Sequence, residues 1–150
     1  MKNSNFANKL RRLQKYSRKI DHLMNSIDRI MNWSENIEIE ILMENEIKRY
    51  AIYKLYQECI ESIFDIVSMI VKDLKLRVED DYSNLEQLRA NNILNEKEMN
   101  ILKKGNHLRN LIVHWYNKIS EEEILKEIKS IINNLNDIII RFKKWIDQFY

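Results

Sequence analysis

The chain has 150 residues, of which 45% are hydrophobic, one is glycine and none is proline. This composition suits one folded domain over residues 1–150 with a real hydrophobic core, and it argues against a disordered segment. The near absence of glycine and proline argues against a sheet protein with many tight turns, so we expect an all-α fold.

The net charge of +2 is distributed unevenly along the chain. The first 20 residues contain no acidic residue and seven basic ones: Lys2, Lys9, Arg11, Arg12, Lys15, Arg18 and Lys19. A basic helix of this kind is typical either of a surface that binds phosphate backbones or of a solvated helix face. Residues 35–46 reverse the pattern with five glutamates and no base, which indicates a solvated face or a contact with a basic partner.

Apolar residues at spacings of three and four predict a first long helix over residues 6–31. The same rhythm continues over residues 37–76, where one straight helix would extend about 60 Å. We therefore expect a kink or a division near Tyr50. Cys59 lies on the apolar stripe of this segment, and as the only cysteine it predicts a buried, unreactive thiol.

The region between residues 78 and 116 is more broken, and its helix starts are indicated by capping-box spacings. These spacings predict helix N-termini near residues 84, 96 and 121, from the pairs Ser83 with Glu86, Asn95 with Glu98, and Ser120 with Glu123. The last helix then carries a broad apolar face from Ile124 to Ile146. We expect an up-and-down bundle of four main helices plus one short helix at 84–91; a coiled coil fits the rhythm less well, because the connections are short and the apolar faces wide.

The same sequence gives expectations about location. The basic N-terminus lacks the apolar stretch of a signal peptide, and no window approaches the roughly 18 uncharged apolar residues of a membrane helix. With a single cysteine, the chain fits a reducing compartment. We expect a cytoplasmic protein that does not contact a membrane.

Gly105 stands inside the helix that begins near residue 96. An interior glycine costs a helix about 1 kcal/mol relative to alanine. This cost indicates either that another backbone approaches closely at Gly105 or that the helix carries a plain imperfection.

The segment from Arg109 to Tyr116 places a cation, an imidazole and a phenol within eight residues. Arg109 can hold a phosphate in its planar charged fork, and His114 can exchange a proton near neutral pH. Together they suit metal-independent cleavage of RNA, in which the 2′-hydroxyl attacks the adjacent phosphodiester. The other histidines, His22 and His107, have no partners at metal-ligand spacing. A purely structural Arg and His pair is the alternative at this point.

Arg109 and His114 are five residues apart, which separates them by about 140° around an ideal helix. They therefore do not share one face. Either the helix ends or distorts near Val113, or the site joins residues from two copies of the chain across a two-fold axis.

The segment from Arg109 to Tyr116 matches the R-x4-H-x-Y pattern of HEPN-domain ribonuclease toxins of the HepT type, including Asn110 directly after the arginine. Residues 49–51 and 57–66 resemble the second helix of that family, and Tyr82 precedes a short helix as the family's tyrosine does. The resemblance covers residues from about 40 to 145. The chain departs from the family where a proline is common before Tyr82, and in its more polar approach to the motif, with Lys104, Asn106 and His107.

This resemblance implies a helical-bundle endoribonuclease, the toxin of a type VII toxin–antitoxin pair, that works as a homodimer. It implies that Arg109 and His114 are catalytic, that Asn110 supports them, and that RNA cleavage needs no cofactor. It also implies a partner, a minimal nucleotidyltransferase antitoxin of the MntA type, that uses ATP and magnesium to attach AMP to Tyr116. A purely structural alternative for Tyr116 is a packed ring with its hydroxyl at the surface.

Two other functions remain open from the sequence. One is a catalytically silent HEPN module that binds nucleotide or serves as the scaffold of the nucleotidyltransferase. The other is a purely structural helical adaptor, which explains the apolar stripes but leaves the clustered polar residues without a role.

Overall fold

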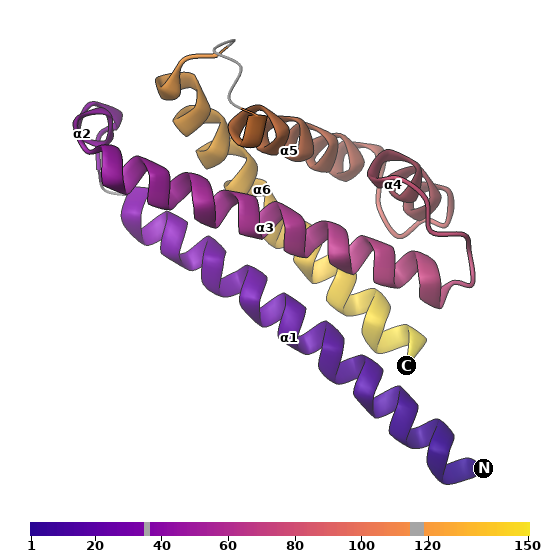
Figure 1. The fold of residues 1–150 in the computed structure, drawn as a ribbon. Helices are drawn as coiled ribbons and strands as arrows, with labels where there is room; N and C mark the ends of the chain where they lie inside the picture. The colour runs from indigo at the N-terminus through magenta and orange to yellow at the C-terminus, as the bar shows by residue number, and fades with distance from the viewer. Residues whose placement is uncertain (35–36, 115–118) are drawn as a thin grey trace.

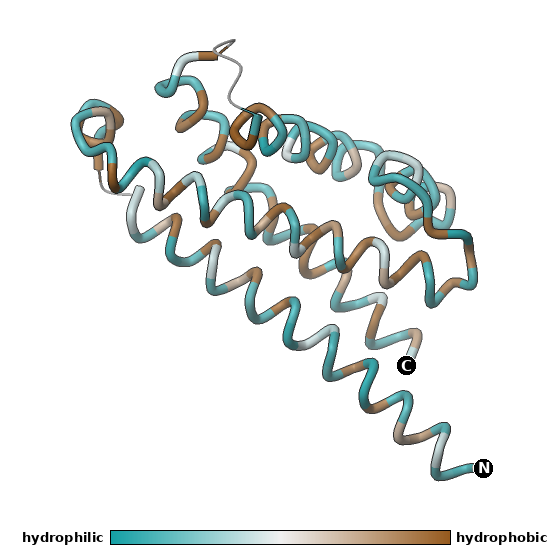
Figure 2. The backbone as a smooth tube through the Cα atoms, viewed as in Figure 1, coloured by the Kyte–Doolittle hydropathy of each residue, from teal (hydrophilic) through white to brown (hydrophobic). Residues whose placement is uncertain are grey.

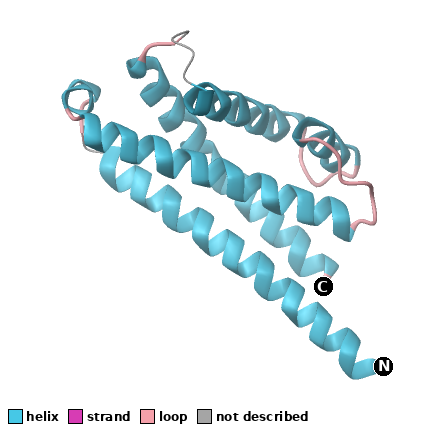
Figure 3. Cartoon of the chain, viewed as in Figure 1, coloured by secondary structure: helices cyan, strands magenta, loops and turns pink. Residues whose placement is uncertain are grey.

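The computed structural model describes residues 1–34, 37–114 and 119–150, and these residues form six helices and no strand (Figure 3). Four helices are long: α1 (Lys2–Ser34), α3 (Glu46–Asp73), α5 (Glu96–His114) and α6 (Glu121–Phe149). Two are short: α2 (Ile39–Glu44) and α4 (Asp81–Ala90). The long helices pack lengthwise, and the two chain ends lie at the same end of the bundle (Figure 1). The all-α expectation is confirmed.

The long second segment is divided, and the division lies at Asn45 rather than at Tyr50. The side chain of Asn45 accepts a hydrogen bond from the Lys48 backbone N–H at 3.0 Å and so caps the start of α3. The division creates α2, a short helix in addition to the short helix that the sequence predicts.

Two of the three predicted helix starts are confirmed. Asn95 and Glu98 exchange reciprocal bonds of 2.8 and 2.9 Å, and Ser120 and Glu123 form the capping box of α6. The predicted start of α4 is wrong by three residues. Asp80 is the cap, and its side chain accepts a hydrogen bond from the Ser83 backbone N–H at 2.9 Å. Two good capping residues stand three positions apart here, and the earlier one begins the helix.

The core is built from the facing apolar sides of the helices, which alternate with hydrophilic stretches along each backbone (Figure 2). Its largest fully buried side chains include Tyr16, Tyr56 and Phe142. Because α1, α3, α5 and α6 all contribute to one continuous cluster, the arrangement is a compact bundle rather than a coiled coil. Within the described ranges, no helix is long and apolar enough to cross a membrane.

A polar network ties both ends of the chain to the end of α3. The carboxylate of Asp73 accepts from the hydroxyl of Tyr16 at 2.6 Å and from that of Tyr150 at 2.8 Å. It also pairs with the guanidinium of Arg12 at 2.9 Å, and Lys9 donates to the carbonyl of Tyr150. The Asp73 side chain therefore holds the C-terminal residue and the first half of α1 at the end of α3.

Gly105 faces α3 and α6, and side chains rather than another backbone approach it. A Cβ atom at this position would lie 3.0 Å from Cδ1 of Ile60 and 3.5 Å from Cγ2 of Ile131. The hydroxyl of Tyr56 donates to the Gly105 carbonyl at 2.7 Å. The expectation of a close backbone was therefore wrong, and α3 and α6 side chains account for the glycine.

Cys59 is fully buried, as its place on the apolar stripe predicts. Burial raises the pKa of its thiol to about 12. Burial, together with the hydrogen bond to Asp73, also raises the pKa of Tyr150 to about 12. Both groups are neutral when protonated, so the folded state keeps protons that the unfolded chain releases at lower pH.

We predict that the free energy of unfolding falls as the pH rises above about 9, because the unfolded chain then binds fewer protons than the folded one. In Cys59→Ala the free energy of unfolding should be lower at neutral pH, because the smaller side chain leaves a small cavity. It should then fall less steeply with pH than in the wild type, by up to about 1.4 kcal/mol per pH unit. Denaturant titrations at a series of pH values measure both slopes. Parallel curves for the two proteins would contradict the role given to the thiol.

Candidate active site at the end of helix α5

Arg109 lies between α5 and α3, with its side chain 24% exposed. Its Nη1 atom is 3.8 Å from Oε1 of Glu61, and its Nη2 donates to Oδ1 of Asn110 at 3.0 Å. Glu61 also accepts from Nε2 of Gln57 at 3.0 Å. The Nε of Arg109 is buried and makes no hydrogen bond within the described part of the chain. The guanidinium is thus held at one edge and retains the capacity to bind an anion.

His114 is exposed and is the last residue of α5. The helix ends at His114, one residue beyond Val113, in agreement with the expected helix end near this position. Arg109 and His114 both lie within α5, and five residues of an ideal helix turn through about 140°. Tyr116, the third member of the motif, falls outside the described residues.

A groove of about 280 Å³ runs between α3 and α5 beside Arg109. Its lining includes Tyr50, Lys54 and Gln57 from α3, and Val113 from the last turn of α5. Gln57 connects the groove to Arg109, because its amide donates to the Glu61 carboxylate that faces the guanidinium. Sequence reasoning did not assign these α3 residues to the site; their signal was a line of polar residues at spacings of three and four on an otherwise apolar helix.

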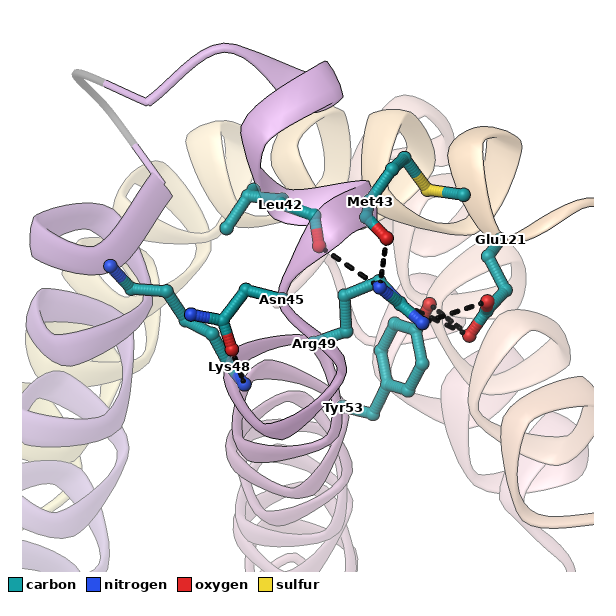
Figure 4. A network of polar contacts seen from close by, with 7 residues as sticks. All are labelled: Leu42, Met43, Asn45, Lys48, Arg49, Tyr53 and Glu121. Atoms are coloured by element: carbon teal, nitrogen blue, oxygen red, sulfur yellow. Dashed lines mark hydrogen bonds and ion pairs between the residues drawn. The ribbon is translucent and has the colours of Figure 1, made fainter.

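The start of α6, just after the motif, is anchored to α3 and α2 by Arg49 (Figure 4). Its guanidinium donates to the carbonyls of Leu42, at 3.1 Å, and Met43. It also faces Glu121, with Nη2 3.3 Å from Oε2, and the same carboxylate accepts from the Tyr53 hydroxyl at 3.3 Å. Burial, together with the charge of Glu121, raises the pKa of Tyr53, which keeps its phenol a neutral donor. This network fixes the segment that follows the motif.

The three polar residues that precede the motif separate in the structure. Asn106 is buried, and its amide lies 3.5 Å from a carboxylate oxygen of Asp81 at the start of α4. Lys104 and His107 are exposed and line a groove of about 480 Å³ between α5 and α6. Over residues 1–34, 37–114 and 119–150, no three His, Cys, Asp or Glu side chains are grouped so that they can hold a metal ion.

A family model described as Ribonuclease HepT-like matches residues 8–142, which is most of the chain. The chain belongs to this family. The match includes the whole of α5 with Arg109, Asn110 and His114, and also the Arg49 network on α3.

Curated relatives of this HepT-like protein carry a matching name. Two proteins of Archaeoglobus fulgidus, each named "Putative RNase", are 31% identical over 121 residues and 35% identical over 120 residues. The first match covers 79% of this chain and 91% of the relative, and the second covers 80% and 84%.

Solved structures show the same fold. A tri-AMPylated HEPN toxin of Shewanella oneidensis, in complex with an MNT antitoxin, matches with a TM-score of 0.78 and 20% identity over 86% of this chain and 96% of that one. The cytosolic protein YutE of Bacillus subtilis, of unknown function, matches with a TM-score of 0.75 and 18% identity over 90% of each chain. The HEPN-like fold that the motif implies is confirmed.

We predict that Glu121→Gln lowers the free energy of unfolding by about 1–2 kcal/mol, because it removes the charge that faces the nearly buried Arg49. Glu122→Gln is the matched control, since the neighbouring glutamate is exposed and pairs with the exposed Lys126 one turn away. Loss of this surface ion pair should lower the free energy of unfolding by less than about 0.5 kcal/mol. Denaturant unfolding of both variants measures the difference, and equal effects would argue against an anchoring role for Glu121.

Proposed function

We propose that this HepT-like protein is the endoribonuclease toxin of a type VII toxin–antitoxin pair and that it cleaves RNA in the cytoplasm without a metal ion. The observation that carries the proposal is that Arg109, a permanently charged fork with a side chain 24% exposed, lies five residues from an exposed His114 on the same helix. Membership of a ribonuclease family supports RNA as the substrate.

In the proposed reaction the ribose 2′-hydroxyl attacks the adjacent phosphorus and the bond from phosphorus to the 5′ oxygen breaks. His114 takes the proton of the 2′-hydroxyl, and a water molecule supplies a proton to the departing 5′ oxygen. Arg109 neutralises the charge that accumulates on the phosphoryl oxygens. Asn110 accepts a hydrogen bond from Arg109 and so positions the guanidinium. The products are a 2′,3′-cyclic phosphate and a 5′-hydroxyl end.

We also propose that the productive site forms between two copies of the chain. Within one copy, α5 stays helical through His114, and the two side chains point about 140° apart. A two-fold axis that brings two α5 ends together pairs Arg109 of each copy with His114 of the other.

The proposed regulator is a minimal nucleotidyltransferase of the MntA type that uses ATP and magnesium to attach AMP to Tyr116. Support comes from a structural neighbour, which is an AMPylated HEPN toxin in complex with an MNT antitoxin. Each AMP adds bulk and a negative phosphate two residues from His114. It therefore competes with RNA for the cationic site.

A catalytically silent module that binds nucleotide or supports the nucleotidyltransferase is the second candidate. The groove beside Arg109 favours it, because tyrosine rings and Lys54 can hold a base and a phosphate. Unmodified, folded wild-type protein that binds nucleotide but never cleaves RNA would establish this alternative.

We predict that the unmodified protein cleaves a labelled RNA in EDTA and leaves cyclic phosphate ends, and that His114→Ala and Arg109→Ala each reduce the rate at least about 100-fold. Circular dichroism must show that both variants are folded. Cleavage by either variant at the wild-type rate would remove that residue from the mechanism.

The shared site is tested by complementation with the same two variants. Arg109→Ala and His114→Ala chains carrying different tags are co-expressed, and the mixed dimer is purified through both tags. A site built from two copies leaves one intact Arg and His pair in the mixed dimer, so activity returns. Pairing within one copy leaves no intact pair, and a mixed dimer as inactive as the parents would contradict the shared site.

We predict that the nucleotidyltransferase with ATP and magnesium increases the intact mass of the wild-type protein by whole AMP units and leaves Tyr116→Phe unchanged. Tyr82→Phe is the matched control, because it removes an exposed phenol on α4, outside the motif. Equal mass increments on wild type and Tyr116→Phe would show that another residue is modified.

A further inference from the structure

The basic run at the N-terminus separates into two sets in the structure. One set faces the bundle and is paired: Arg12 contacts Asp73 at 2.9 Å, and Lys19 contacts Asp65 at 2.6 Å. Lys9 donates to the carbonyl of Tyr150. These three cations hold α1 against α3 and the C-terminus, so each already has a partner within the bundle.

The other set lies on the outer face of α1 and is exposed. Its members recur at spacings of four, three, four and seven, which places them on one side of the helix: Arg11, Lys15, Arg18, His22 and Arg29. Arg11, Lys15 and Arg18 form no ion pair with any acid in the described ranges. By the helical rise, the array from residue 11 to residue 29 extends about 27 Å.

The residues that border these cations are also polar and exposed: Gln14, Asp21, Asn25 and Asp28 lie along one side of the line. Large apolar side chains of α1, such as Leu10 and Met24, lie about 100° or more from the line through Lys15 and His22. Trp33 follows the cations at the end of α1, but it is partly buried against the core, and the guanidinium of Arg29 lies 5.9 Å from the centre of its ring. A surface that binds a protein partner usually has an apolar or aromatic centre, whereas the middle of this face carries cations. Such a line of cations matches a phosphate backbone, which offers negative charges at regular intervals.

We propose that the outer face of α1, defined by Arg11, Lys15, Arg18 and Arg29, binds the phosphate backbone of the RNA substrate. The identity of the RNA as substrate rests on the proposed function. α3 lies between α1 and α5, so this face is separated from Arg109 by the width of the bundle (Figure 1). The bound part of the RNA is therefore distant from the scissile phosphate, and the substrate is an RNA long enough to contact both surfaces.

The test measures binding of a long structured RNA to His114→Ala protein, which leaves the RNA intact. The charge-removal variant adds Arg11→Gln, Lys15→Gln and Arg18→Gln. The matched control adds Lys72→Gln, Lys97→Gln and Lys129→Gln, which removes the same charge from three exposed lysines on α3, α5 and α6. Glutamine forms helices nearly as well as arginine and lysine, so both proteins should fold, as circular dichroism verifies.

We predict that the charge-removal variant binds the RNA about 10-fold or more weakly at low salt and that its slope of log affinity against log salt is smaller by about 2–3. The control should keep the affinity and slope of the parent. Equal loss in both variants would show a general effect of net charge and would overturn the proposal, as would no loss in either.

The remaining outcomes separate this proposal from the proposed function. If the charge-removal variant keeps its RNA affinity but no longer binds the nucleotidyltransferase, the face is a partner surface and the proposal is wrong. Cleavage of a short RNA by wild-type protein is measured in parallel. Its absence counts against the ribonuclease assignment, while the binding slopes still decide whether α1 contacts RNA.

Discussion

The burial of α3 on several sides at once is the constraint on which the rest of the structure depends. Helices α1, α2, α4 and α5 all pack against it, and its buried side chains continue along its whole length. Each buried aliphatic side chain contributes about 1.5–3 kcal/mol relative to exposure, so this helix is the main source of packing energy. Polar groups along this helix are then available as fixed anchors for the other elements.

Each functional element is positioned by one of those anchors. Asp73 holds α1 and the C-terminus, Tyr56 holds α5 through the Gly105 carbonyl, and Arg49 holds α2 and the start of α6. Gln57 and Glu61 form the edge that faces Arg109. The site at the end of α5 is therefore built on rigid helices, which suits a reaction that depends on placement of a phosphate.

Rigidity also limits how the two motif side chains are placed. Arg109 and His114 both lie within α5, where five residues of an ideal helix turn through about 140°. The proposed second copy would pair the two groups without bending α5. In that proposed dimer, a bulky, charged group added close to His114 would lie where the two copies meet.

Much of this protein was determined by the sequence alone. The lack of proline and the three-four rhythm of apolar residues determine long helices, and the caps at Asn95 and Ser120 determine where two of them begin, because these signals act over a few neighbouring residues. The R-x4-H-x-Y pattern, together with residues 49–51, residues 57–66 and Tyr82, likewise indicated the family. Tertiary structure decided the rest: that Asn45 and Asp80 begin their helices, that side chains of α3 and α6 explain Gly105, and that the basic run divides into paired and outward-facing cations. The surroundings of Gly105 and the division of the basic run depend on partners more than 20 residues away, which local patterns do not reveal. Asn45 and Asp80 act on backbone groups only three residues away, but local patterns did not rank them ahead of Tyr50 and Ser83.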